Sequence, residues 1–387
     1  MKKKIAILGS TGSIGKTLLK LIEKDKKKFD VILLTANSNY KTLLNQAKKF
    51  KVKNLIVSNL TNFKILKNKT SRSKYKIFNN FDQLDRIFKS KIDYSMCAIT
   101  GVDGLEPTFN LIKHTRKIAI ANKEAIICGW NLINAELKKN NTEFIPVDSE
   151  HFSIWYSIKN NHDKIDNLFL TASGGPFINL PLKSFKKINL TQALKHPNWK
   201  MGKKITIDSA TMMNKVFEVI EAKNIFNVNY DKISIITHPK SYIHSITKFK
   251  NGLIKLVAHD TNMKIPIYNT IYSNTDSYKL ITKKIDFNKL NNLEFNPVNF
   301  KKFPLVNILK FLPSNNSLFE TVIVSANDEL VQAFLHKKIK FNEISKKLIK
   351  FISKSEFKKY KSYQPKKIQE ILKLNKYVRF KINLKSI

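Results

Sequence analysis

Near its start the chain reads Lys4-Ile-Ala-Ile-Leu-Gly9-Ser-Thr-Gly12-Ser-Ile-Gly15, and the run Lys16-Thr-Leu-Leu-Lys-Leu-Ile-Glu23 follows. This order predicts a short buried strand, a glycine-rich turn and a helix. Free backbone N–H groups and the helix dipole would then face an anion, as they do where a dinucleotide pyrophosphate binds. The spacing G-x-x-G-x-x-G is a relative of the G-x-G-x-x-G fingerprint, and such a turn alone is weak evidence.

Further strand-like runs recur after this segment, with helical segments between them. They are Val31-Ile-Leu-Leu-Thr35, Asn54-Leu-Ile-Val57, Tyr94-Ser-Met-Cys-Ala-Ile99, Lys117-Ile-Ala-Ile-Ala121 and Phe144-Ile-Pro-Val147. Strands that alternate with helices form a parallel sheet with helices on both faces. The first part of the chain is therefore predicted to be a doubly wound, Rossmann-like α/β domain.

The turn after the second strand, Thr35-Ala-Asn-Ser-Asn39-Tyr-Lys41, contains no acidic residue. Enzymes that use NAD usually place Asp or Glu here, on the ribose 2′-hydroxyl. Without that acid nothing repels a 2′-phosphate, and Ser38, Asn39 and Lys41 could contact one. NADPH is therefore the expected cofactor. A polar turn with no cofactor role is the alternative.

A second cofactor-facing segment is expected at Asn122-Lys123-Glu124, which follows a strand and begins a helix. Residues at this point of a doubly wound sheet can line the nicotinamide side of the cleft. Lys123 fits a surface lysine equally well on these grounds alone.

Two carboxylates lie in Pro146-Val-Asp148-Ser-Glu150-His151, directly after a predicted strand. In an extended segment residues i and i+2 point the same way, so we expect Asp148 and Glu150 to converge on one cation. Oxygen ligands on a short segment suit Mg²⁺ or Mn²⁺ better than zinc. The same letters also fit a helix cap with Asp148 or Ser149 as the N-cap residue.

A third carboxylate follows in Ile207-Asp208-Ser209-Ala-Thr-Met-Met-Asn214-Lys215-Val-Phe-Glu218. We expect Asp-Ser-Ala-Thr to begin a helix on which Asn214 and Glu218 share a face. Lys215 and Glu218 are then i, i+3 neighbours, about 5 to 6 Å apart. A cation for phosphate beside a carboxylate for metal fits a small phosphorylated polyol. A surface helix with a Lys215–Glu218 ion pair is the alternative.

Two small-residue segments add to this pattern. Leu170-Thr-Ala-Ser173-Gly-Gly-Pro-Phe177 places a hydroxyl beside two glycines, where backbone N–H groups can approach a phosphate closely. His196-Pro-Asn-Trp199-Lys-Met201-Gly202 surrounds a large aromatic with turn residues, as a mobile lid requires. A lone Gly-Gly pair or tryptophan most often has only a structural role. The order of these segments along the chain makes the functional interpretation specific.

Composition limits the other function classes. The net charge of +41 suggests a nucleic-acid partner, but only four of the 70 basic residues are arginine, and the lysines are spread along the chain. We therefore expect a solvated lysine surface and no specific nucleic-acid partner. No apolar run approaches the roughly 20 residues of a spanning helix, so we expect no membrane association. The strand predicted at residue 4 leaves no room for a signal peptide, and we expect a cytoplasmic protein.

The segments quoted above resemble the 1-deoxy-D-xylulose 5-phosphate reductoisomerases, enzymes of the non-mevalonate isoprenoid pathway. The matching blocks begin at residues 9, 121, 146, 173, 196 and 208, and later echoes begin at His238, Met263 and Ala326. They run in family order from near residue 1 to about residue 335. The resemblance implies reductive rearrangement of 1-deoxy-D-xylulose 5-phosphate to 2-C-methyl-D-erythritol 4-phosphate, with NADPH and Mg²⁺ or Mn²⁺.

The resemblance also implies a role for each matching residue. Metal ligands and catalytic carboxylates would be Asp148, Glu150 and Glu218, with Lys123 reaching the substrate. The substrate would contact Ser149, Glu150, Ser173, His196, Ser209, Asn214, Lys215 and Glu218. The cofactor would contact Thr11, Gly12, Ser13, Ile14, Asn39, Asn122, Glu124 and Gly202. Trp199 and Met201 would form the flap.

The architecture that the resemblance implies has an NADPH domain at residues 1–149 and an α/β catalytic domain at 150–275 that carries the metal, the substrate and a dimer interface. A connecting segment at 276–299 and a C-terminal helical domain at 300–387 would complete a homodimer subunit. Two positions depart from the family. Val216 replaces a usual glycine before the helical metal ligand, and Asn37 replaces one in the second-strand turn. Asn37 is a residue that tolerates left-handed backbone geometry.

Two alternative functions also fit parts of the sequence. One is another NADP-linked dehydrogenase with a Rossmann half, such as a semialdehyde or homoserine dehydrogenase. A thiol-acylating form needs an activated cysteine, and Cys128 lacks an evident base partner. We expect Cys97 and Cys128 to be buried structural thiols. The other rival is a basic nucleic-acid-binding protein without catalysis.

Overall fold

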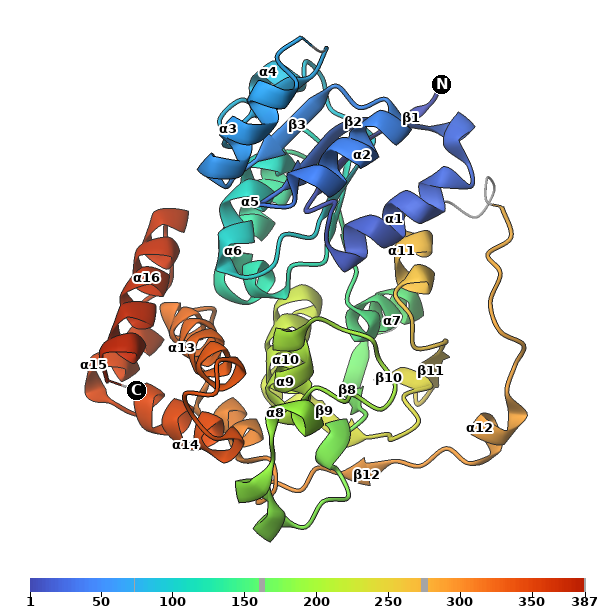
Figure 1. Cartoon of the computed structure of the whole chain (residues 1–387). Helices are drawn as coiled ribbons and strands as arrows, with labels where there is room; N and C mark the ends of the chain where they lie inside the picture. Colours follow the sequence, from blue (N-terminus) through green and yellow to red (C-terminus); the bar gives the residue numbers. More distant parts are fainter. Residues whose placement is uncertain (73, 160–163, 273–277, 386–387) are drawn as a thin grey trace. The chain divides into compact units, whose positions relative to one another are not determined.

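The computed structural model describes residues 1–387 except 73, 160–163, 273–277 and 386–387 (Figure 1). The chain forms two compact units, which are described separately. The first contains Met1–Ala125, Leu132–Asp148 and Met263–Ile281, and the second contains Ile126–Asn131, Ser149–Asn262 and Thr282–Ile387. The four segments expected along the chain, at 1–149, 150–275, 276–299 and 300–387, stay a prediction, because the division into two compact units does not assign roles to residues.

The first unit is built on a seven-stranded sheet in the order β4-β3-β2-β1-β5-β6-β7. Every neighbouring pair is parallel. The strands are β1 Lys3–Leu8, β2 Phe29–Ala36, β3 Asn54–Val57, β4 Lys76–Phe78, β5 Tyr94–Cys97, β6 Lys117–Ile120 and β7 Glu143–Pro146. The predicted doubly wound sheet is confirmed, and only the short edge strand β4 lacked a clear apolar run. The strand order reverses between β1 and β5, so the glycine turn after β1 lies at the switch point where such sheets bind ligands.

Helices cover this sheet because their apolar faces complete its core. They are α1 Ser13–Glu23, α2 Tyr40–Phe50, α3 Leu60–Lys69, α4 Leu84–Ile87, α5 Leu105–Ile112, α6 Lys123–Lys139 and α11 Lys264–Ile271, with 3-10 turns at Lys26–Lys28 and Val102–Gly104. The late helix α11 joins the core beside α1, and the hydroxyls of Tyr94 and Thr270 lie 2.7 Å apart. Cys97 and Cys128 are buried free thiols, as predicted. Burial raises the pKa of the Cys97 thiol to about 12.

The second unit contains a mixed sheet in the order β11-β10-β8-β9-β12. Strands β8 and β9 are parallel, and the other pairs are antiparallel. The strands are β8 Ile165–Ala172, β9 Ile233–Thr237, β10 Ile243–Phe249, β11 Ile254–Ala258 and β12 Asn296–Pro297. Helices α7 (Ser149–Ile158) and α10 (Met213–Phe226) pack on this sheet through a cluster that includes Ile154, Leu168 and Val219.

The remaining helices of this unit lie mostly in the C-terminal part of the chain. They are α8 Leu190–Ala193, α9 Lys203–Ala210, α12 Phe287–Asn291, α13 Leu318–Leu335, α14 Phe341–Ile352, α15 Ser355–Lys358 and α16 Ile368–Lys385, with 3-10 turns at Gly175–Phe177, Leu182–Lys187, Tyr230–Lys232, Pro304–Phe311 and Lys359–Ser362. Helix α13 is buried along nearly its whole length and packs on α9, α14 and α16. The predicted helical C-terminal region is confirmed. Among the described residues, no helix combines the length and apolar content needed to span a membrane.

The start of α13 holds a buried carboxylate. Glu320 is 1% exposed and accepts hydrogen bonds from the backbone N–H and the hydroxyl of Ser317, which form a capping box. Burial raises the pKa of Glu320 to about 7, although the hydrogen bonds from Ser317 act in the opposite direction. The folded state therefore favours the protonated side chain.

We expect stability to fall as the pH rises from about 5 to 8, because Glu320 must then ionise while buried. Its folded pKa lies above the unfolded value, so its contribution is complete below the unfolded pKa and is lost as the pH passes through the folded pKa. The free energy of unfolding should fall by about 2–3 kcal/mol over this range.

Thermal unfolding midpoints of the wild type and Glu320→Gln should therefore converge or cross as the pH rises from about 5 to 8. Glu343→Gln, in the partly exposed capping box of α14, is the control and should follow the wild type. Parallel profiles for Glu320→Gln and the wild type would contradict this.

Candidate active site

A buried ammonium group lies on helix α10 in the second unit. The Nζ atom of Lys215, on α10, lies 2.8 Å from Oε1 of Glu150 and 2.5 Å from Oε2 of Glu218. It also donates to the backbone carbonyl of Thr171 at 2.8 Å. Burial lowers the pKa of Lys215, but the two carboxylates more than offset this, so its pKa lies above the usual value. Lys215 is therefore a permanent cation between two carboxylates.

Glu150 reaches this position because helix α7 begins at Ser149. The Ser149 hydroxyl donates to Oε2 of Glu150 at 2.6 Å, and Oε1 faces Lys215. The expectation that Asp148 and Glu150 share one side of an extended segment is wrong, since a helix starts between them. The helix-start alternative describes the segment correctly.

Glu218 reaches the site from one face of α10. Asn214, one turn earlier, donates from its side-chain amide to Oε1 of Glu218, so the predicted i, i+4 pair shares a face. The predicted start of this helix at Asp208 is wrong. Helix α9 ends at Ala210, and Met212 adopts a left-handed conformation with φ 62° before α10 begins at Met213. The reversal at Met212 separates Asp208 and Ser209 from the helix that carries Lys215.

Three carboxylates can share one cation at this position. Asp148 directly precedes α7, and ligand atoms of Asp148, Glu150 and Glu218 lie within 4.8 Å of one another. All three offer only oxygen, the donor that Mg²⁺ and Mn²⁺ prefer. The Lys215 ammonium already provides positive charge between two of them. The donor set and its charge therefore fit a hard divalent cation.

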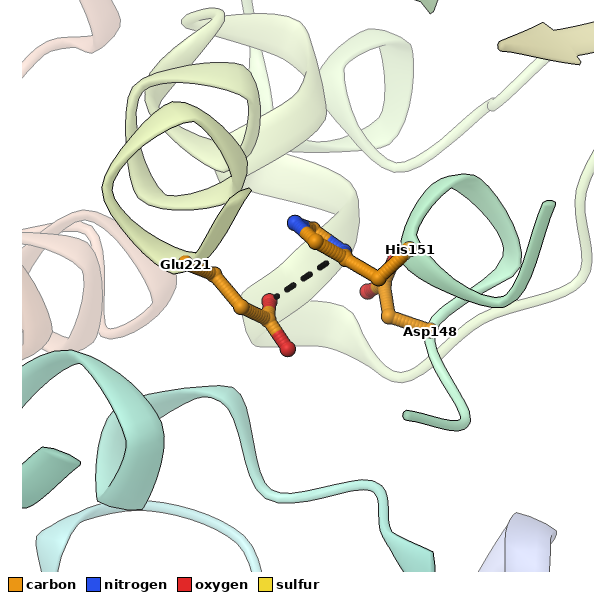
Figure 2. A group of neighbouring side chains, drawn as sticks. All are labelled: Asp148, His151 and Glu221. Atoms are coloured by element: carbon orange, nitrogen blue, oxygen red, sulfur yellow. Dashed lines mark ion pairs between the residues drawn. The ribbon is translucent and has the colours of Figure 1, made fainter. Parts of the chain in front are cut away.

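A second group of ligating side chains overlaps the first. Asp148, His151 and Glu221 also offer ligand atoms within 4.8 Å of one another (Figure 2). His151 Nε2 lies 2.9 Å from the Glu218 carbonyl oxygen, which can only accept, so Nε2 carries a proton. His151 Nδ1 faces Oε2 of Glu221 at 3.5 Å. Sequence reasoning assigned no role to His151 or Glu221, although Glu221 follows Glu218 at i+3 on one helix.

Hydroxyl and imidazole groups form a polar cluster in the same unit. His196 Nε2 lies 3.1 Å from the hydroxyl oxygens of both Ser173 and Ser209. Its Nδ1 accepts the backbone N–H groups of Asn198 and Trp199 at 3.2 and 2.9 Å, so the ring proton resides on Nε2. Burial, assisted by the charge of Lys215, lowers the pKa of His196 to about 4. A neutral imidazole therefore presents one N–H donor toward the two serines.

The two glycines after Ser173 shape this cluster. Gly174 and Gly175 have φ values of 79° and 65°, a region that side chains strain. A Cβ atom on Gly175 would lie 3.0 Å from the carbonyl oxygen of Ser209. The glycine turn therefore packs its backbone directly on the end of α9, which brings Ser173 and Ser209 to the same imidazole.

The predicted flap is an irregular loop between α8 and α9. Its Asn198 donates to the carbonyl of Pro239 at 2.6 Å and to the hydroxyl of Ser241 at 2.9 Å. The Trp199 and His244 rings pack in a T-shaped arrangement with a centroid distance of 5.9 Å. Met201 is partly exposed. Gly202, predicted to contact the cofactor, is the N-cap residue of α9 in this second unit.

The glycine turn of the first unit forms a close-fitting backbone cradle. Gly9 has φ 80°, and a Cβ there would lie 2.6 Å from the Ala98 carbonyl oxygen. A Cβ on Gly15 would lie 2.5 Å from the Ser10 Cα atom. Gly12 caps α1 without a side-chain hydrogen bond, so the first N–H groups of the helix can receive an anion. The predicted contacts at this turn, Thr11, Gly12, Ser13 and Ile14, are partly or fully exposed.

The second-strand turn keeps its side chains at the surface. Ser38, Asn39 and Lys41 are exposed where β2 ends. Asn39 also caps α2, since its side chain accepts the N–H of Thr42 at 3.1 Å. Asn37 does not use the left-handed geometry that it would tolerate, because its φ is not positive.

The start of α6 is tied down by its own side chains. The side chain of Asn122 accepts the N–H of Ala125 at 2.7 Å and donates to the carbonyl of Gly101 at 2.9 Å. Both the oxygen and the nitrogen of its amide therefore form hydrogen bonds within the protein. Lys123 forms an ion pair with Asp148 at 2.7 Å. Lys123 is buried and Glu124 is partly exposed. The surface-lysine alternative for Lys123 is therefore wrong.

Family models match most of the chain. The 1-deoxy-D-xylulose 5-phosphate reductoisomerase model matches residues 5–129, and the model of its C-terminal domain matches residues 144–226. A further DXP reductoisomerase C-terminal domain model matches residues 259–381. The 1-deoxy-D-xylulose 5-phosphate reductoisomerase of Pelagibacter ubique (strain HTCC1062) is 59% identical over 100% of both chains. The enzyme of that name from Phocaeicola vulgatus is 37% identical over 94% of this chain and 95% of its own.

Solved structures agree with these matches. The 1-deoxy-D-xylulose 5-phosphate reductoisomerase of Zymomonas mobilis in complex with NADPH superposes with a TM-score of 0.87 at 30% identity, over 100% of both chains. A DOX-P reductoisomerase in complex with NADPH, fosmidomycin and magnesium superposes with a TM-score of 0.90 at 28% identity, over 99% of this chain and 98% of that one.

The two overlapping ligand groups can be separated by two matched substitutions. Glu218→Gln should weaken Mn²⁺ binding, measured by electron paramagnetic resonance, by at least about tenfold, because it removes a charged oxygen ligand. Glu221→Gln, one turn further along α10, should change it by less than about threefold. A larger loss in Glu221→Gln than in Glu218→Gln would assign the cation to His151 and Glu221 instead.

Proposed function

The chain belongs to the 1-deoxy-D-xylulose 5-phosphate reductoisomerase family, and we propose that the side chains around Lys215 carry the reaction of this family. It is an enzyme that converts 1-deoxy-D-xylulose 5-phosphate to 2-C-methyl-D-erythritol 4-phosphate with NADPH and a divalent metal. The observation that supports the residue roles best is the pair of carboxylates, Glu150 and Glu218, joined by the Lys215 ammonium.

The proposed metal ligands are Asp148, Glu150 and Glu218. When bound, magnesium or manganese supplies a Lewis acid that polarises substrate oxygens and stabilises enediolate-like charge. Lys215 holds the two helical carboxylates together and neutralises part of their charge. We therefore propose that Lys215 and the divalent cation compete for these oxygens, and that Lys215 turns toward the substrate phosphate when it loses them.

Phosphate binding is assigned to the polar cluster of Ser173, Ser209, Asn214 and Lys215, with His196 above it. Neutral His196 can donate from Nε2 to a phosphate oxygen in place of the serine hydroxyls that it now contacts. Its low pKa keeps Nδ1 as an acceptor for the flap backbone at neutral pH. His196 thus links phosphate binding to the loop with Trp199 and Met201, which we propose closes over the substrate.

The cofactor is NADPH, and each of its proposed contacts is taken from the matching residues of the family. Thr11, Gly12, Ser13 and Ile14 would hold its pyrophosphate at the start of α1, and Asn39 would lie near its 2′-phosphate. Asn122, Glu124 and Gly202 are the proposed contacts near the nicotinamide. Lys123 and Ser149 would orient the substrate. The ion pair between Lys123 and Asp148 would hold these two side chains in position. Hydride transfer to the intermediate aldehyde is the chemistry of the cofactor.

We also propose a cytoplasmic homodimer without a specific nucleic-acid or membrane partner. Strand β11 supports the dimer, because it is an edge strand that carries the exposed Ile254 and Leu256 and follows the exposed Leu253. The buried reduced cysteines suit a reducing compartment. The proposed roles divide the chain into an NADPH domain at 1–149, a catalytic domain at 150–275, a connection at 276–299 and helices at 300–387.

One assay tests the function and the cofactor preference together. NADPH should be consumed with 1-deoxy-D-xylulose 5-phosphate only when Mg²⁺ or Mn²⁺ is present. NADH should have a kcat/KM about 100-fold lower, because two charge-assisted hydrogen bonds to the 2′-phosphate contribute about 3 kcal/mol. Lys41→Glu should reduce this preference, whereas Lys48→Glu, two turns later on α2, should not. Equal kcat/KM for both cofactors in the wild type would contradict the proposal.

A further inference from the structure

A buried carboxylate lies beside the proposed phosphate ligand Ser209. Asp208 is 1% exposed and forms the last turn of α9. Its Oδ1 accepts a hydrogen bond from the side-chain amide of Asn327 at 2.8 Å, and its Oδ2 lies 3.0 Å from Nζ of Lys204. Both carboxylate oxygens therefore face partners supplied by α13 and by the preceding turn of α9.

These contacts continue into the last helix of the chain. Lys204 also pairs with Asp328 at 2.9 Å. Arg379, on α16, pairs with Asp328 at 3.1 Å and with Glu329 at 2.7 Å. The network therefore ties the end of α9 to two C-terminal helices, far along the chain from the carboxylates around Lys215.

The opposite side of the same turn packs against the glycine loop. A Cβ on Gly175 would lie 3.0 Å from the Ser209 carbonyl oxygen, a tight contact, and the Ser209 hydroxyl lies 3.1 Å from His196 Nε2. Ser209 thus lies between the loop that carries Ser173 and Asp208, which Asn327 binds. A shift of Asp208 must move Ser209, because the two residues are adjacent in one helical turn.

Charge makes the orientation of Asp208 important. A carboxylate next to a phosphate ligand repels a phosphate dianion unless it is neutralised and turned toward other partners. Lys204 supplies the neutralising charge. Asn327 must present its N–H₂ group, because the carboxylate can only accept hydrogen bonds. Asn327→Asp would instead bring two carboxylate oxygens to the 2.8 Å separation that now joins the amide and the carboxylate.

We propose that Asn327 and Lys204 are positioning residues for substrate phosphate, which act by fixing Asp208 and thereby Ser209. The C-terminal helices then set the affinity for the phosphorylated substrate without touching it. This inference rests on the proposed role of Ser209 in the phosphate site.

The test compares steady-state constants of Asn327→Asp with those of the wild type. KM for 1-deoxy-D-xylulose 5-phosphate should rise at least about tenfold, the effect of misplacing a hydrogen bond to a charged group, while kcat changes by less than about threefold. The Kd for NADPH should stay unchanged. The reciprocal double variant Asn327→Asp/Asp208→Asn restores an amide–carboxylate pair and should return KM to within about threefold of the wild type.

Ser325→Ala is the matched control, because its hydroxyl donates to Asn375 on α16 at 2.7 Å and does not bind α9. It should lower the thermal midpoint and leave KM unchanged. If Asn327→Asp does not fold, Asn327→Ser removes the reach to Asp208 without adding charge, and its KM should still rise. Ser209→Ala separates the two levels of the proposal. An unchanged KM in Ser209→Ala overturns the phosphate role itself.

A raised KM in Ser209→Ala beside an unchanged KM in both Asn327 variants overturns only the positioning role. The positioning role is also overturned if the double variant has the same KM as Asn327→Asp, or if Ser325→Ala raises KM as much as Asn327→Asp does. Each of these outcomes would show that the network only holds the C-terminal helices in place.

Discussion

The ion pairs of Lys215 with Glu150 and Glu218 are the constraint on which the candidate site depends. Two carboxylates with side-chain exposures of 11% and 1% would repel each other in this position without a nearby cation. Lys215 supplies that cation, and the carbonyl of Thr171 holds the ammonium at the end of β8. Lys215 therefore holds Glu150 of α7 close to Glu218 of α10.

The same constraint links the proposed metal site to the proposed phosphate site. Lys215 lies on α10 between Asn214 and Glu218, and its charge also helps to keep His196 neutral. Neutral His196 joins Ser173 and Ser209 to the flap backbone. A change of partner at Lys215 should therefore affect the polar cluster around His196 and the loop that carries Trp199. The Asp208–Asn327 contact extends this dependence to the C-terminal helices.

Much of this arrangement could be predicted from local sequence patterns. Buried parallel strands are short apolar runs, so β2, β3, β5, β6 and β7 were recognisable, and the spacing of Asn214 and Glu218 predicted their shared face. The ends of helices were less predictable. Asp-Ser-Ala-Thr has the composition of a helix start, yet it ends α9, because contacts with Gly175 and Asn327 override the local preference. Lys215 and Asp208 each have one partner nearby in the sequence, but their other partners, Glu150 and Asn327, come from distant segments, and no single-sequence pattern reports such pairs.

The response of Lys215→Met to metal tests the central claim most directly. Methionine fills a similar volume but leaves Glu150 and Glu218 without their shared ammonium. Added Mg²⁺ should therefore raise the thermal midpoint of this variant more than that of the wild type, since the ion replaces the missing charge. Its metal affinity should increase while its affinity for 1-deoxy-D-xylulose 5-phosphate falls. An equal or smaller response to Mg²⁺ would show that Lys215 and the metal do not compete for these carboxylates.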